Sequence, residues 1–166
     1  MNLSQVFAGL GFSQKITLDL TLFLVLAFAS FVFGMLIGRY RLMTVLINIY
    51  VAIAILGAVS VKLLPDYSNR LILFFGIILV LTLIGKKMFE IPISGGGKGF
   101  LWRVFVMSFL ELMLMLSMAL TIIPKKIALG YVSSSAYDYL VFGNAPLVWM
   151  LLPLIFMFLI HKKISR

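Results

Sequence analysis

Five long runs with almost no charged side chain constrain the fold of this chain more than any other feature. A helix that crosses a bilayer needs about 20 mostly apolar residues. The runs cover residues 20–38, 42–61, 71–85, 104–124 and 139–160, and Glu111 is the one charge inside them. We therefore predict an all-α, polytopic transmembrane helical bundle that forms one domain over residues 1–166. Its five predicted spans are 18–38, 42–62, 70–86, 103–123 and 141–160.

The third run is the shortest, with 15 residues between Arg70 and Lys86. Its helix must be short, or the flanking cations must reach back to the interface along their apolar stems. Prolines support the other limits, because most fall at or just beyond a predicted helix end. These are Pro65, Pro92, Pro124 and Pro146. Pro153 lies inside the last span and predicts a kink there.

The composition excludes a soluble protein. Hydrophobic residues make up 63% of the chain and charged residues 11%, and the mean hydropathy is +1.19. A soluble domain is about half apolar and about a quarter charged, and a short chain cannot hide so much apolar surface from water. The lipid bilayer is therefore the first predicted partner.

The positive charges predict the orientation. The formal net charge of +9 could suggest nucleic-acid binding, but the cations stand in short clusters between apolar runs instead of along one basic face. With the N-terminus outside, 9 of the 14 cations lie on the inner side, which favours an N-out, C-in orientation. The inner nine are Arg39, Arg41, Lys86, Lys87, Lys98, Arg103, Lys162, Lys163 and Arg166.

Residues for catalysis or metal binding are few. Cysteine is absent, which excludes disulfides and thiolate sites. The sequence has no paired carboxylates, Ser-His-Asp set or metal-ligand cluster, so we expect no enzyme, no catalytic residue, no metal and no cofactor. The glycine-rich loop 94–99 lacks the Ser or Thr that follows the lysine of a nucleotide-binding loop.

Residues 1–16 are predicted to form a short interfacial helix.

Glu111 is the most informative residue. It lies near the middle of the fourth predicted span, where a carboxylate that faced lipid would be costly. We expect it to face the bundle and to be neutral or paired. Two interpretations stay open: a site that handles protons or cations, or a neutral Glu hydrogen-bonded across helices as part of the packing. Ser30, Asn48 and Tyr50 are predicted at the same depth.

Other polar and small residues have simpler interpretations. Asp19 opens the first span, where a carboxylate favours the helix dipole. Gly34 and Gly38 form a small-residue pair that would allow close helix packing. Arg39 and Arg41 follow in a tight turn, where they fix topology or bind anionic lipid headgroups.

This arrangement resembles the colicin V production (CvpA) family of small bacterial inner-membrane proteins. The likeness covers about residues 17–123: Asp19 ahead of the first span, the small-residue and basic turn from 34 to 41, two further spans, and the Gly-rich basic loop 94–103 before a fourth. The fifth span has no counterpart in it. The resemblance implies a role in secretion or envelope homeostasis, with no catalytic residues to carry over.

Three functions follow as predictions. The first is an accessory or assembly protein that packs with itself or with another membrane protein. The second is a small proton- or ion-coupled transporter or channel in which Glu111 lines a polar path. The third is a holin-like pore former, suggested by the small size and the basic C-terminal tail.

Overall fold

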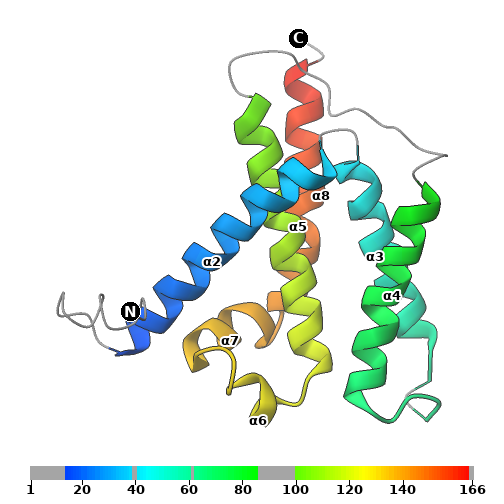
Figure 1. The fold of residues 1–166 in the computed structure, drawn as a ribbon, viewed down its shortest axis with the longest axis vertical. Coiled ribbons are helices and arrows are strands. Elements are labelled where there is room, and N and C mark those ends of the chain that lie inside the picture. Colours follow the sequence, from blue (N-terminus) through cyan, green and yellow to red (C-terminus); the bar gives the residue numbers. More distant parts are fainter. Residues whose placement is uncertain (1–13, 39–40, 61, 86–99, 165–166) are drawn as a thin grey trace.

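The computed structural model describes residues 14–38, 41–60, 62–85 and 100–164. Every regular element in these ranges is an α-helix, as Figure 1 shows, which confirms the all-α class there. The helices are α2 (Gln14–Ile37), α3 (Leu42–Ala58), α4 (Tyr67–Gly85), α5 (Phe100–Ile122), α6 (Lys125–Ala128), α7 (Ser134–Val141) and α8 (Ala145–Ile164). Residues 1–13 of the predicted interfacial helix and the glycine-rich loop 94–99 lie outside the described residues.

Three helices are long and apolar enough to cross a membrane, which is typical of a membrane protein. They are Asp19–Ile37 within α2, Tyr67–Gly85, and Leu101–Ile122 within α5. A fourth span results if α7 and α8 are taken together, although they are bent by 64° at a short break. The apolar helix α3 is shorter, with 17 residues. By length alone the described residues therefore provide three or four spans, and five spans stay a prediction.

The limits of α3 and α4 differ from the predicted ones. α3 ends at Ala58 instead of near 62, because Val59 leaves the helical conformation with ψ 120°. α4 begins at Tyr67 and takes Arg70 into its first turns. A long arginine stem can lie along a helix while its charge stays at the interface. The third helix, expected to be the shortest, thus has 19 residues and is longer than α3.

The last predicted span, 141–160, contains most of α8 and the final residue of α7, a short helix that the charge pattern did not predict. Val141 ends α7, and α8 begins at Ala145. Between them Gly143 has φ 60°, a left-handed conformation that costs glycine little. This glycine allows the chain to turn between the two helices.

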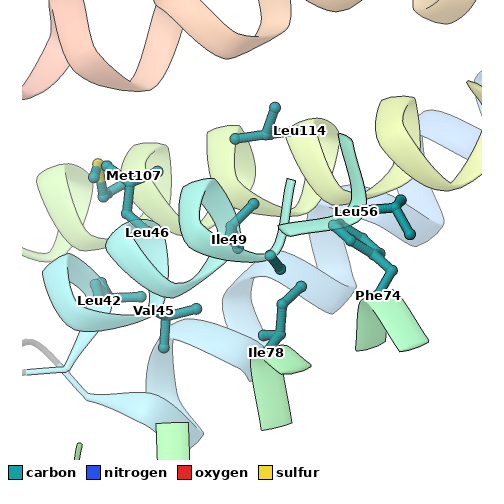
Figure 2. Packing of buried hydrophobic residues seen from close by; sticks show 10 residues of the cluster. Leu42, Val45, Leu46, Ile49, Leu56, Phe74, Ile78, Met107 and Leu114 are labelled. Carbon is teal, nitrogen blue, oxygen red and sulfur yellow. The ribbon is translucent and has the colours of Figure 1, made fainter. Parts of the chain in front are cut away.

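Helix α5 is the centre of the bundle. It contacts α2, α3, α4, α7 and α8, and in Figure 1 α2 crosses it obliquely while α3 and α4 lie side by side next to it. Figure 2 shows the main apolar core, which joins α3, α4 and α5. Its buried residues are Leu42, Val45, Leu46, Ile49, Ala52, Leu56, Phe74, Ile78, Met107 and Leu114. A second cluster joins the end of α5 to α6 and α7.

Candidate functional site

Glu111 lies halfway along α5, and its side chain is 0% exposed. Met107 and Leu114 lie four residues before and three residues after it, on the same face of the helix. Both belong to the main core, and Figure 2 shows Met107 beside Leu46 of α3. The carboxyl group is therefore enclosed by protein and does not face lipid.

Neither carboxyl oxygen of Glu111 has a hydrogen-bond partner among the described residues. The hydroxyl group of Ser108, almost one turn earlier, is also buried and has no partner in the described part of the chain. Burying an ionised carboxylate without a partner costs tens of kcal/mol in an idealised apolar medium. The group must therefore be neutral, or a bound cation must balance its charge. Because Glu111 stands alone, one proton or one singly charged cation would be enough.

Tyr50 is the predicted polar residue that interacts with this carboxyl group. It lies within electrostatic range of Glu111, and its hydroxyl group donates a hydrogen bond to the carbonyl oxygen of Met150 in α8. That carbonyl is three residues before Pro153, whose ring disturbs the backbone bonds of the preceding turn. Tyr50 therefore links the surroundings of Glu111 to the proline-containing part of α8.

Asn48 and Ser30 are bonded elsewhere. The side-chain amide of Asn48 donates to the hydroxyl oxygen of Thr82 at 3.1 Å and so joins α3 to α4. The hydroxyl group of Ser30 donates to the carbonyl oxygen of Leu26 in its own helix at 2.7 Å. The structure therefore does not gather all four predicted polar residues into one site.

Gly34 and Gly38 have different roles. Gly34 lies where α2 crosses α5, so close that an added Cβ atom would be 2.7 Å from the Oγ atom of Ser108. Gly38 has no atom within 4 Å of such a Cβ atom and instead ends α2, with φ 72°. Its carbonyl oxygen accepts a hydrogen bond from the backbone N–H of Arg41 at 3.2 Å, which closes the turn into α3. Arg39 lies outside the described residues.

The sequence predicted that Asp19 opens the first helix, and this prediction is wrong. Asp19 lies beyond the first turn, because α2 already begins at Gln14. Its carboxylate accepts a hydrogen bond from the hydroxyl group of Ser133. Ser133 is the N-cap of α7, and its Oγ atom accepts from the backbone N–H of Ala136 at 3.0 Å. The negative charge of Asp19 therefore lies at the N-terminus of α7, where the helix dipole stabilises it.

The other end of α7 is also held by side chains. The hydroxyl group of Ser117 in α5 donates to the carbonyl oxygen of Leu140 at 2.6 Å. The indole N–H of Trp149 in α8 donates to the carbonyl oxygen of Tyr139 at 3.1 Å. These bonds satisfy carbonyl groups that the last turn of a helix leaves without partners. Sequence reasoning missed this arrangement, although Ser133 is a typical N-cap residue.

The chain matches no protein-family model, and comparison with curated proteins and with solved structures finds no similar protein. The resemblance to the colicin V production family stays a prediction.

Proposed function

We propose that this protein is a small multi-pass carrier of the bacterial cytoplasmic membrane that binds a proton or a singly charged cation at Glu111. One observation carries the proposal: the carboxyl group at the middle of the central helix is fully buried, and no side chain or backbone group within the described ranges forms a hydrogen bond with it. Ionisable residues inside membrane helices commonly mark ion paths and proton relays. The proposed topology has five spans, with the N-terminus outside.

A packing role for Glu111 has less support. Interhelical hydrogen bonds in membrane proteins contribute about 0.6 kcal/mol on average, and Glu111 makes none with the described residues. A carboxyl group that is buried without a bond lowers stability. Its presence is therefore better explained by the binding of an ion than by the packing of helices.

In the proposed mechanism, the occupied site has no net charge and the core stays closed. When the proton or cation leaves, Glu111 becomes an uncompensated charge, and water must enter or the helices must separate. Tyr50 is placed to respond, because it lies near Glu111 and is bonded to Met150. We propose that the loss of the ion loosens this bond and frees the part of α8 around Pro153 to move.

The second candidate is an accessory or assembly protein linked to secretion or envelope homeostasis. The observation that favours it is the exposed surface of α2, where Phe28 and Leu36 are 68% and 80% exposed. A helix of a partner protein, or of a second copy, would cover such side chains. Lipid tails would cover them equally well, so this observation discriminates less than the burial of Glu111. The holin-like pore former rests on the size and basic tail alone.

The test is ion flux in proteoliposomes that contain a pH-sensitive dye. We expect the wild-type protein to dissipate an imposed proton or Na⁺ gradient, and Glu111→Gln to abolish that flux while still eluting as a folded protein. Asp138→Asn is the matched control, because Asp138 is exposed on α7. Wild-type flux in Glu111→Gln would overturn the proposal. Absence of flux in the wild type, with a second protein co-purifying in mild detergent, would favour the accessory role.

A further inference from the structure

A groove of about 200 Å³ lies between the N-terminal part of α2 and the α7–α8 break. Three aromatic side chains, those of Phe23, Tyr139 and Trp149, line it together with Met113 of α5. Among the described residues that line it, Asp19 is the only charged one. The groove is thus apolar with a single negative charge at one side.

The charge of Asp19 is not balanced by an ion pair among the described side chains. Its one recorded bond is from the neutral hydroxyl group of Ser133. An ionised carboxylate has about four lone-pair positions, so Asp19 can still accept further hydrogen bonds or contact a cation. Among the described side chains, Asp19 therefore places a negative charge at the groove that has positions for a further partner.

Two of the three aromatic walls, Phe23 and Trp149, are held by contacts of their rings. The ring of Phe23 packs edge-to-face on Phe109, with centroids 5.7 Å apart. The indole ring of Trp149 is fixed by its hydrogen bond to the carbonyl oxygen of Tyr139. Aromatic faces attract organic cations, most strongly when the site excludes water. Rigid walls also reduce the entropy that a ligand loses on binding.

Helix α5 carries both Glu111 and one residue that lines the groove. Met113 lines the groove two residues after Glu111, and positions two apart on a helix point in nearly opposite directions. Two residues also correspond to a rise of only about 3 Å. The wall of the groove and the buried carboxyl group are therefore on opposite sides of α5 at nearly the same depth.

We propose that this groove binds an amphipathic organic cation, a quaternary or protonated amine carried on an apolar aromatic body. The cationic nitrogen lies against Asp19, and the body lies against Phe23, Tyr139 and Trp149. The idea that this cation is the transported substrate rests on the proposed carrier function, in which α5 connects the groove to the ion site. Binding of the cation to the groove can be tested separately, without any ion gradient.

The experiment uses a pair of ligands of equal shape. Benzyltrimethylammonium and neopentylbenzene differ only in the charged nitrogen that replaces a carbon atom. Binding is followed by the fluorescence of Trp149 in a Trp102→Phe background, which leaves Trp149 as the only tryptophan because the chain has two. We expect the cation to bind at least about tenfold more tightly than the neutral compound, a difference of about 1.4 kcal/mol.

Variants separate the charge from the apolar walls. Asp19→Asn keeps an oxygen that can accept from Ser133, and should remove the preference for the cation. Asp138→Asn, on α7 but outside the lining of the groove, should preserve it. Ala136→Phe should fill the groove and abolish binding of both compounds, which keeps the test decisive if Asp19→Asn does not fold.

Equal affinity for the two compounds would overturn the proposal, as would unchanged binding in Ala136→Phe. A phospholipid amine is the competing occupant. If nanodiscs that contain phosphatidylethanolamine lose the binding seen in phosphatidylglycerol nanodiscs, the groove is a lipid site and the proposal fails. Glu111→Gln should still bind the cation, so failure here is distinguishable from failure of the ion site.

Discussion

A Cβ atom on Gly34 of α2 would lie 2.7 Å from the Oγ atom of Ser108 in α5 and 3.2 Å from a methyl carbon of Val104. The first distance is shorter than real Cβ contacts, so one helix or the serine side chain would have to move. This contact fixes how closely α2 can cross the central helix.

Gly34→Ala should therefore destabilise the protein by about 1 kcal/mol. Overpacking costs about 1–3 kcal/mol, and the better helix propensity of alanine offsets up to about 1 kcal/mol of it. The measurement is unfolding in mixed micelles with increasing denaturing detergent. Gly76→Ala is the control, since nothing lies within 4 Å of a Cβ atom there, and it should be neutral or stabilising. Adding Ser108→Ala to Gly34→Ala should restore part of the loss. Equal stability of the two single variants would contradict the close crossing.

Two buried serines on α5 should respond differently to alanine. Ser117→Ala removes the hydrogen bond to the carbonyl oxygen of Leu140 and should cost about 1 kcal/mol. Ser108→Ala removes a hydroxyl group that has no partner in the part of the chain that the structure describes, and should be neutral or slightly stabilising. Limited proteolysis at the end of α7 should also increase in Ser117→Ala alone. The same loss in both variants would mean that the hydroxyl group of Ser117 does not hold α7.

Tyr50→Phe removes the hydroxyl group that bonds to the carbonyl oxygen of Met150. We expect a loss of about 0.6 kcal/mol or more, because that carbonyl lies in a helical turn already disturbed by Pro153. Hydrogen exchange of the α8 backbone after Pro153 should become faster. Tyr131→Phe is the control, because Tyr131 is 81% exposed. If exchange in α8 does not change, the hydroxyl group of Tyr50 does not stabilise this part of the helix.

The main helices could be predicted because a span of the bilayer needs a continuous run of apolar residues, which is visible in the local sequence. A run of apolar residues between charges gives a helix wherever it occurs, and α2, α3, α4, α5 and most of α8 follow such runs. Helix limits were less accurate where single residues decide them. Val59 ends α3 early, and the long stem of Arg70 lets this residue belong to α4 while its charge stays at the interface.

The short helix α7 could not be predicted from hydropathy. Its 8 residues include Asp138 and several polar side chains, so the hydropathy of this segment is typical of a loop. Its ends are held by Asp19, Ser117 and Trp149, which lie far away in the sequence. Those contacts depend on the packing of α2, α5 and α8 against one another.

The candidate site was predicted in part, for a physical reason. The burial of Glu111 follows from the cost of a carboxylate at mid-span, and the structure encloses it fully. Its partners could not be predicted, because equal depth does not place side chains on facing sides of their helices. Asn48 thus pairs with Thr82, and Ser30 turns back on its own helix.

The most direct test of the central claim is infrared spectroscopy of the carboxyl groups in the membrane-embedded protein. In a sodium-free neutral buffer we predict the carbonyl stretch of a neutral carboxyl group, present in the wild type and absent from Glu111→Gln. Raising the pH or adding the coupling cation should replace this band by a carboxylate band as the site exchanges its proton. A Glu111 band that neither treatment changes would mean that the group is fixed in the packing, and would contradict a role in ion binding.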